Sequence, residues 1–315
     1  MKKSAAASPV VYVSAALCAL LAALNLSACD AGETSDEPLA QGGATANPAR
    51  GGTTSVGSGG GGQTTQGGYT SSGMGFTVTS KQGAGTSTQQ YQKEDVSRNG
   101  TYYKFMANGW GPGFESQSVA WDGGSFTVQS MQGKQGPQYQ PASYPTMFYG
   151  LYSMERSLEA KLPKAISAMT ALNTGWRWSA NGNTGQYNAA WDIWLADAAG
   201  NFSSFLMVWL RDPPGQQPAG STKANGLTVP GVQGTWNLWA GTVNGKPCIS
   251  YVRPEGQDMP EFEFDVLNFI KDAKGRSAQG VMLVGEQVQS VAIGFEIWNG
   301  PVTNLVSQDF YVDVK

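Results

Sequence analysis

Short runs in which apolar and polar residues alternate begin at about Gly73 and continue to the C-terminus, and Gly, Pro and Asn interrupt them at short intervals. Alternation with period two places successive side chains on opposite faces of a β-strand. Many short strands separated by turn residues are typical of a β-sandwich. The pattern therefore predicts an all-β jelly-roll sandwich of two antiparallel sheets. The clearest expected strands are residues 102–106, 125–130, 189–195, 205–210, 235–239 and 288–298.

One short helix is expected within this domain. Apolar residues recur at helical spacing between Asp265, a suitable N-cap, and Gly275, which suits a helix end. These apolar residues are Val266, Phe269, Ile270 and Ala273. No internal repeat is visible, so residues 73–315 are expected to form one domain.

The N-terminus has the pattern of a secretory signal. Lys2 and Lys3 precede an apolar run over residues 10–26, and the run ends in Leu26-Ser27-Ala28-Cys29, which resembles a bacterial lipobox. We therefore expect a signal peptide over residues 1–28 and a lipid on Cys29, which would anchor the protein in the cell envelope. Ordinary cleavage with a secreted product and an uncleaved anchor are the alternatives, and the choice between inner and outer membrane is left open.

A tether is expected between the lipid and the domain. Residues 29–72 are rich in Gly, Ser, Thr and Gln and hold almost no large apolar side chains. Such a composition cannot bury enough surface to offset the entropy of ordering. This segment is therefore predicted to be a disordered linker.

Composition narrows the chemistry that the domain can perform. The chain has 10 tryptophans and no histidine, which excludes Ser-His-Asp catalysis and His-ligated zinc and leaves carboxylates as acid/base candidates. We expect no metal and no cofactor. The formal net charge of −3 gives no basic surface for phosphates, so nucleic-acid binding is not expected. The domain is expected to be a monomer.

Three expected strands share a face that carries acids and aromatic rings. If Ile193, Val208 and Ile297 and their alternating neighbours face the core, the opposite face carries a second set of side chains. That set is Asp192, Trp194, Phe205, Met207, Trp209, Glu296 and Trp298. Indoles stack on the apolar faces of sugars, and carboxyls bind hydroxyls, so this face is typical of a sugar cleft. The alternative is that the tryptophans belong to the core.

Five motifs follow one another along residues 100–315. They are Tyr103 with Asn108-Gly109-Trp110-Gly111; Pro145 through Gly150 leading to Leu162-Pro163; Tyr187-Asn188-Ala189-Ala190-Trp191-Asp192-Ile193-Trp194; Met207-Val208-Trp209-Leu210 with Pro218-Ala219-Gly220; and Gly294-Phe295-Glu296-Ile297-Trp298. In this order they resemble glycoside hydrolase family 12, the jelly-roll endo-β-1,4-glucanases and xyloglucanases that act with retention. Each motif alone is weak, and the order makes the resemblance specific.

The resemblance implies roles for the residues of the predicted cleft. Glu296 would be the acid/base, Asp192 the carboxylate that supports the nucleophile, and Phe205 stands where the family has its nucleophilic glutamate. Residues expected to contact the substrate are Asn108, Trp110, Trp194, Met207, Trp209 and Trp298.

The chain departs from the family pattern near this expected nucleophile. A retaining mechanism needs two carboxyls about 5–5.5 Å apart, and Phe205 supplies none. The Asn-Asn pair before the tryptophan has Ala107 in its first place, and the family's His-Trp-Gly stretch is Tyr152-Ser153-Met154.

Three functions remain open from the sequence. The first is a lipid-anchored protein that binds β-1,4-glucan or a related polysaccharide with little or no hydrolysis. The second is a working endo-β-1,4-glucanase that uses Glu296 and a relocated carboxylate such as Asp192. The third is a scaffold or adhesin whose cleft is filled by Phe205 and Tyr152 and binds no sugar.

Overall fold

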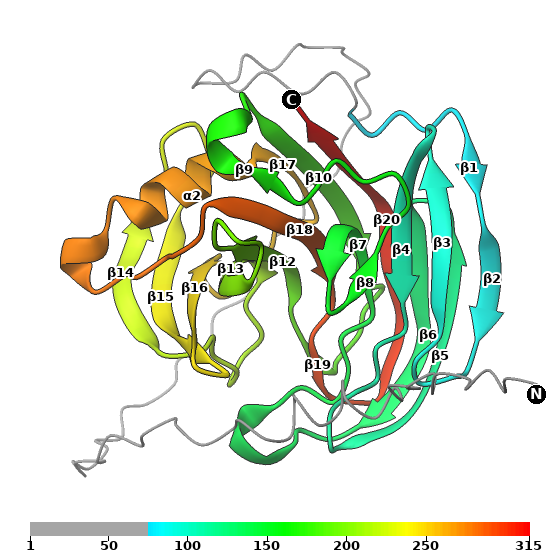
Figure 1. Ribbon diagram of the computed structural model, residues 1–315. Helices are drawn as coiled ribbons and strands as arrows, with labels where there is room; N and C mark the ends of the chain where they lie inside the picture. The colour runs from blue at the N-terminus through cyan, green and yellow to red at the C-terminus, as the bar shows by residue number, and fades with distance from the viewer. Residues whose placement is uncertain (1–74) are drawn as a thin grey trace, which may run out of the picture.

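The computed structural model describes residues 75–315, which form two β-sheets packed face to face (Figure 1). The expected signal peptide, the lipidated Cys29 and the linker lie outside the described residues. Within residues 75–315, no helix is both long enough and apolar enough to cross a membrane. The all-β jelly-roll prediction is confirmed.

The larger sheet has twelve strands, ten of them in the order β1-β3-β4-β7-β18-β12-β13-β16-β15-β14. Strand β8 pairs with β7, and β9 pairs with β18. Its bounds are β1 Lys81–Gln82, β3 Lys93–Arg98, β4 Thr101–Met106, β7 Thr146–Tyr152, β8 Glu155–Arg156, β9 Lys164–Ala165, β12 Ala189–Ala196, β13 Phe202–Arg211, β14 Ser221–Leu227, β15 Trp236–Val243, β16 Lys246–Val252 and β18 Gln287–Gly294.

The smaller sheet has six strands in the order β17-β10-β20-β6-β5-β2. Its bounds are β2 Ala84–Ser87, β5 Phe114–Asp122, β6 Ser125–Gly133, β10 Leu172–Ser179, β17 Glu261–Asp265 and β20 Val302–Val314. A separate pair joins β11 Gln186–Tyr187 to β19 Ile297–Asn299. Short 3-10 helices span Pro137–Tyr139, Ile166–Ala168 and Ser277–Gln279.

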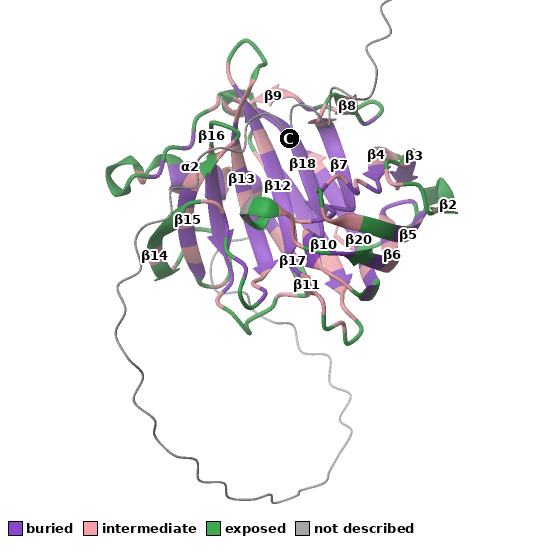
Figure 2. Ribbon diagram, turned by 90° about the horizontal axis from the view of Figure 1, so that it is seen from below, coloured by how far each residue is buried: buried purple, intermediate pink, exposed green. Residues whose placement is uncertain are grey.

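The core lies between the two sheets, and burial is concentrated in their central strands (Figure 2). In β12, Trp191, Ile193 and Leu195 are fully buried in this core, as period-two alternation predicts. In β13, the same holds for Leu206 and Val208. Asp192 and Trp194 of β12 and Phe205 of β13 alternate with these residues and therefore lie on the opposite face of the large sheet.

Helix α2, Val266–Lys274, confirms the one helix expected from the sequence. The Asp265 side chain accepts a hydrogen bond from the backbone N–H of Leu267 at 3.0 Å, which caps the first turn. Its buried side chains are Val266, Phe269, Ile270 and Ala273. The helix contacts β10 and β17 of the small sheet.

The expected strand over residues 288–298 is interrupted, and here the prediction was wrong in detail. Strand β18 ends at Gly294 and β19 begins at Ile297, in a different sheet. A Cβ at position 294 would collide with the Pro145 carbonyl oxygen and approach the Tyr144 ring, so this residue allows a close backbone approach. The interruption places Glu296 between two strands.

Candidate functional site

The face of the large sheet that is turned away from the core, called the outer face here, brings the predicted site residues into register. Asp192 of β12 lies opposite Met207 of β13, and Trp194 lies opposite Phe205. The next strand pair continues the first row, because Met207 lies beside Ser250 of β16, which faces Trp239 of β15. The pairing of neighbouring strands therefore places polar side chains such as Asp192 and Ser250 beside aromatic rings on the outer face.

Glu296 is held by the backbone and side chain of Asn188. The Asn188 N–H donates to the Glu296 carbonyl oxygen at 3.0 Å, and the Glu296 N–H donates to Asn188 Oδ1 at 2.9 Å. Asn188 Nδ2 also donates to Glu296 Oε2. Burial raises the pKa of the Glu296 carboxyl to about 8, against the lowering effect of the Asn188 hydrogen bond and with a smaller rise from the Asp192 charge. Glu296 is therefore protonated at neutral pH, as a general acid must be.

Asp192 is a buried acid with one occupied oxygen. Its Oδ2 accepts hydrogen bonds from Tyr152 OH at 3.1 Å and from Trp194 Nε1 at 2.8 Å. Burial raises the pKa of Asp192 to about 6, although these two hydrogen bonds lower it. Burial and the Asp192 charge raise the pKa of Tyr152 well above its usual value. Tyr152 therefore stays a phenol that donates to this carboxylate.

Phe205 lies on the outer face, within a group of aromatic rings. Its ring is 4.7 Å from Phe202 and 5.6 Å from Trp194, centroid to centroid. Trp194 also packs against Tyr152 at 4.5 Å and Phe202 at 4.7 Å. Phe205 thus lies on the outer face, as the alternation predicts, and Trp194, half-buried like Trp110, stays a predicted stacking residue.

Two of the other predicted stacking residues are almost fully buried. Trp209 is 2% exposed and Trp298 is 3% exposed, and their ring centroids are 5.8 Å apart. Trp298 Nε1 donates to the Tyr139 carbonyl oxygen at 2.7 Å. The two indoles pack against each other beside the site. That they stack on a sugar stays a prediction.

The other three residues predicted to contact the substrate are less buried, and one of them also forms a hydrogen bond within the protein. Trp110 and Met207 are half-buried. Asn108 has a positive φ of 48° and donates from Nδ2 to the Tyr144 carbonyl oxygen at 3.1 Å. Asn108 Nδ2 therefore helps to hold the loop that carries Trp110. The Asn108 Oδ1 atom is the side-chain group left to accept a hydrogen bond from a ligand.

Three buried polar atoms on the outer face have no hydrogen-bond partner among the described residues. They are Asp192 Oδ1, Trp209 Nε1 and Ser290 Oγ. Their strands β12, β13 and β18 are neighbours in the sheet. Buried polar groups are nearly always paired, and these three atoms have almost no accessible surface, so an enclosed water is the partner that would fit them. Residues 75–315 contain no group of three His, Cys, Asp or Glu side chains that could hold a metal ion.

Sequence reasoning missed several side chains of this face. Asn188 precedes the Asp192 strand directly, and its role depends on the break at Glu296, which no periodicity announces. Trp239 could have been found, because Trp236 and Leu238 are buried and alternate with it. Ser290 carries no sequence signal of its own.

Comparisons with known proteins agree with this architecture. The family model described as glycosyl hydrolase family 12 matches residues 101–315. A probable xyloglucan-specific endo-β-1,4-glucanase A of Aspergillus terreus is 27% identical over 154 residues, which cover 48% of this chain and 59% of that protein. The corresponding Aspergillus aculeatus enzyme is 29% identical over 92 residues, covering 29% of this chain and 38% of that protein. The matches thus span about half the length of these curated relatives.

Solved structures are similar over a longer part of the chain. The endo-1,4-β-glucanase CelB2, a cellulase, is 26% identical with a TM-score of 0.63, covering 73% of this chain and 99% of that one. Endoglucanase Cel12A from Rhodothermus marinus is 26% identical with a TM-score of 0.61, covering 73% of this chain and 98% of that one. With its fold, its motif order and the match over residues 101–315, the chain belongs to glycosyl hydrolase family 12.

Proposed function

We propose that this chain binds β-1,4-glucan or a related polysaccharide on the outer face of its large sheet, with little or no hydrolysis. Family membership and the glucanase and xyloglucanase names of its relatives support the polymer class. The protonated Glu296 carboxyl and the partly exposed rings of Trp110 and Trp239 support a ligand with hydroxyls and apolar faces. The observation that carries the proposal is the Phe205 ring, which packs against Phe202 and Trp194 where the resemblance to the family would put the nucleophilic glutamate.

The chemistry of retention explains why this ring matters. One carboxyl attacks the anomeric carbon while another protonates the leaving oxygen, and the two lie about 5–5.5 Å apart. Phe205 has no lone pair to attack with. The nearby Asp192 gives one oxygen to Tyr152 and Trp194, so it is committed to the structure of the face.

Glu296 retains a role in binding under this proposal. Its carboxyl is protonated at neutral pH, since its pKa is about 8. It can therefore donate a hydrogen bond to a sugar oxygen while Asn188 fixes its position. Partly exposed rings such as Trp110 and Trp239 supply apolar surface for the sugar faces.

A second candidate is slow hydrolysis by Glu296 and Asp192, and the order of their pKa values favours it. Glu296 at about 8 is protonated where Asp192 at about 6 is ionised. An acid and a base with separated pKa values are the requirement of an inverting mechanism, whose carboxyls lie roughly 6.5–9.5 Å apart. Asp192 would then be the base that activates the attacking water.

Affinity electrophoresis and a reducing-end assay test these functions together. The chain should migrate more slowly in gels that contain xyloglucan, mixed-linkage glucan or xylan, and it should release few reducing ends from them. Asp192→Asn should leave this release unchanged under the first candidate and abolish it under the second. Equal mobility with and without every polymer would instead support the scaffold alternative and refute glucan binding.

We also propose that the protein is anchored in the bacterial cell envelope by a lipid on Cys29. The lipobox-like Leu26-Ser27-Ala28-Cys29 supports this. Metabolic labelling with an alkyne fatty acid should mark the wild-type chain and not Cys29→Ser. Cys248→Ser is the matched control, because Cys248 is 1% exposed in the folded domain, and it should keep the label. Label that persists in Cys29→Ser would refute the anchor.

A further inference from the structure

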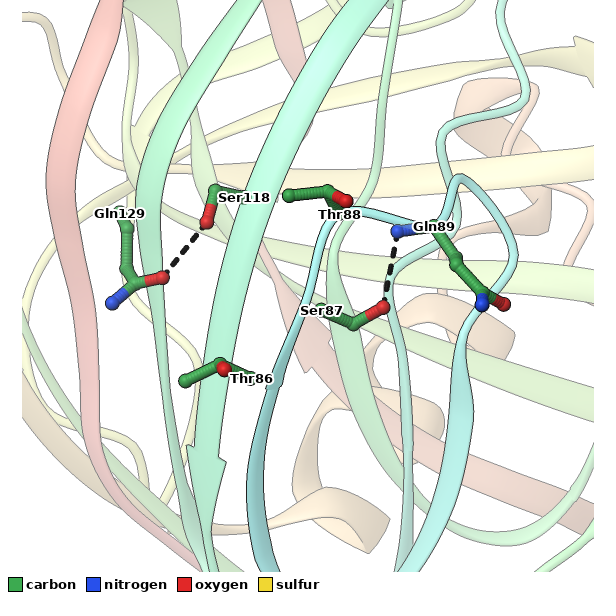
Figure 3. A pocket seen from close by; sticks show the side chains of 6 residues that line it. All are labelled: Thr86, Ser87, Thr88, Gln89, Ser118 and Gln129. Carbon is green, nitrogen blue, oxygen red and sulfur yellow. Dashed lines mark hydrogen bonds between the residues drawn. The ribbon is translucent and has the colours of Figure 1, made fainter.

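A groove on the small sheet is separate from the outer face and has no part in the function proposed above. It lies on the exposed face of that sheet near the edge strand β2 and has a volume of about 470 Å³ (Figure 3). Its lining residues are Thr86, Ser87, Thr88, Gln89, Ser118 and Gln129.

Two parts of the chain build this groove. Ser118 lies on β5 and Gln129 on β6, within the region that matches the family. Residues 86–89 precede the matched region 101–315, and their strand β2 pairs with β5 through Thr86 opposite Ala120. The N-terminal part of the domain therefore adds one wall to a surface that the family region provides.

The lining has the hydrogen-bonding groups of a neutral site. Ser118 Oγ donates to Gln129 Oε1 at 2.8 Å, and the Gln89 N–H donates to Ser87 Oγ at 3.0 Å, as Figure 3 shows. These bonds orient the side chains while Gln129 Nε2 keeps its donors. No lining residue carries a charge, so the groove offers nothing to pair with a phosphate, a sulfate or a metal ion.

We propose that this groove is a second binding site for a neutral, hydroxyl-rich glucan segment. The identity of the polymer rests on the proposed function, whereas the existence of the site rests on the groove itself. The groove is shallow and open to solvent, so a glucan segment would lie along it without being enclosed. Because no aromatic ring lines it and hydrogen bonds largely replace bonds to water, the isolated site is weak.

The groove and the outer face lie on different sheets, so a weak site in the groove can add to binding at the outer face. The outer face belongs to the large sheet and the groove to the small one, and the two sheets of a sandwich expose opposite faces. The protein is therefore bivalent and bridges two glucan chains. Two linked weak contacts retain a polymer far better than either contact alone.

An NMR titration of the full chain carrying Cys29→Ser with cellotetraose tests the second site. Two groups of backbone amides should shift, one around Glu296 and Trp110 and one around Thr86 and Gln129. The groove group should saturate at an approximately tenfold higher concentration, because it lacks stacking rings.

Variants assign the second group of shifts to the groove. Thr86→Ala combined with Gln129→Ala should abolish the groove shifts and keep those near Glu296. Both side chains are exposed, so the fold should tolerate the change. Gln308→Ala, an exposed glutamine on β20 of the same sheet, should change neither group.

The outcomes separate the two proposals. Absence of groove shifts at about ten times the concentration that saturates the outer face, or groove shifts that survive the double variant, would overturn the second site. Groove shifts without any response near Glu296 would uphold the second site and refute glucan binding on the outer face.

Discussion

Asn188 and Glu296 are joined by three hydrogen bonds that fix the acid of the outer face. Two of them involve backbone atoms, at 3.0 and 2.9 Å, and the third joins Asn188 Nδ2 to the Glu296 carboxyl. The backbone pairing exists because β18 ends at Gly294 and leaves Glu296 outside the sheet ladder. One asparagine therefore fixes the position of this carboxyl and lowers its pKa, against the larger rise that burial causes.

Asn188→Ala should raise the pKa of Glu296 above its value of about 8, because the lost Nδ2 hydrogen bond favours the ionised carboxylate. A carbon-13 NMR titration of labelled glutamate would measure the shift, with Glu296→Gln to assign the signal. Asn225→Ala changes an exposed asparagine on β14 and should leave the titration unaltered. An unchanged or lower pKa in Asn188→Ala would contradict the role given to this hydrogen bond.

Phe205→Glu should create or raise retaining hydrolysis of β-glucan, since it puts a carboxyl where the resemblance to the family implies the nucleophile. Reducing ends should increase by about tenfold or more over wild type, and NMR of the products should show retained configuration. Phe205→Gln has nearly the same shape without the charge and should show no gain.

The new glutamate would lie beside Trp194 and Phe202, so part of the protein's stability should be lost. Circular dichroism would show whether the variant remains folded. If Phe205→Glu folds and binds glucan but releases no more reducing ends, a missing carboxyl at position 205 is not what limits hydrolysis. Tyr152, which holds Asp192 at 3.1 Å, would then be the next residue to change.

The sequence predicted those features of the molecule that follow from local periodicity. Alternation placed Trp191 and Ile193 in the core and Asp192 and Phe205 on the other face, and the structure has them there. Burial of rings on that outer face was not predicted. Trp209 and Trp298 pack against each other, and Trp298 also bonds to Tyr139 of the 3-10 helix Pro137–Tyr139, and these neighbours are distant in the sequence.

The error at Glu296 has the same cause, because local periodicity does not report contacts between distant segments. The alternation of apolar and polar residues continues through Phe295 and Glu296 without a break, so the sequence predicts one strand. In the structure, β18 ends there and β19 begins in a different sheet. Nothing in the local pattern reports that a Cβ at position 294 would meet the Pro145 carbonyl. Contacts between distant segments decided these details, and they determine how Glu296 is held.

The stability of the protein should depend on pH through its raised carboxyl pKa values. Glu296 titrates at about 8 in the folded state, above the ordinary 4.5, so its contribution is complete below about 4.5 and is lost as pH rises to 8. Asp192 behaves likewise between 3.8 and about 6. The free energy of unfolding should therefore fall between pH 5 and 8.

Glu296→Gln isolates this effect, because glutamine keeps the hydrogen-bonding shape without titrating. The difference in unfolding free energy between pH 5 and 8 should shrink by about 2–4 kcal/mol, at about 1.4 kcal/mol per pKa unit. Urea unfolding at the two pH values measures it. The same difference in wild type and variant would show that Glu296 is ionised at neutral pH.

Two tryptophans should respond differently to truncation because they differ in burial. Trp298 is 3% exposed, so Trp298→Ala should lower the free energy of unfolding by about 3–5 kcal/mol. Trp110 is half-buried, and Trp110→Ala should mainly weaken glucan binding, by about tenfold or ~1.4 kcal/mol. Urea unfolding and affinity electrophoresis of both variants distinguish the effects. If Trp110→Ala is retarded as strongly as wild type in every glucan gel, Trp110 does not contribute to binding. Trp239 would then be the main ring of the binding surface.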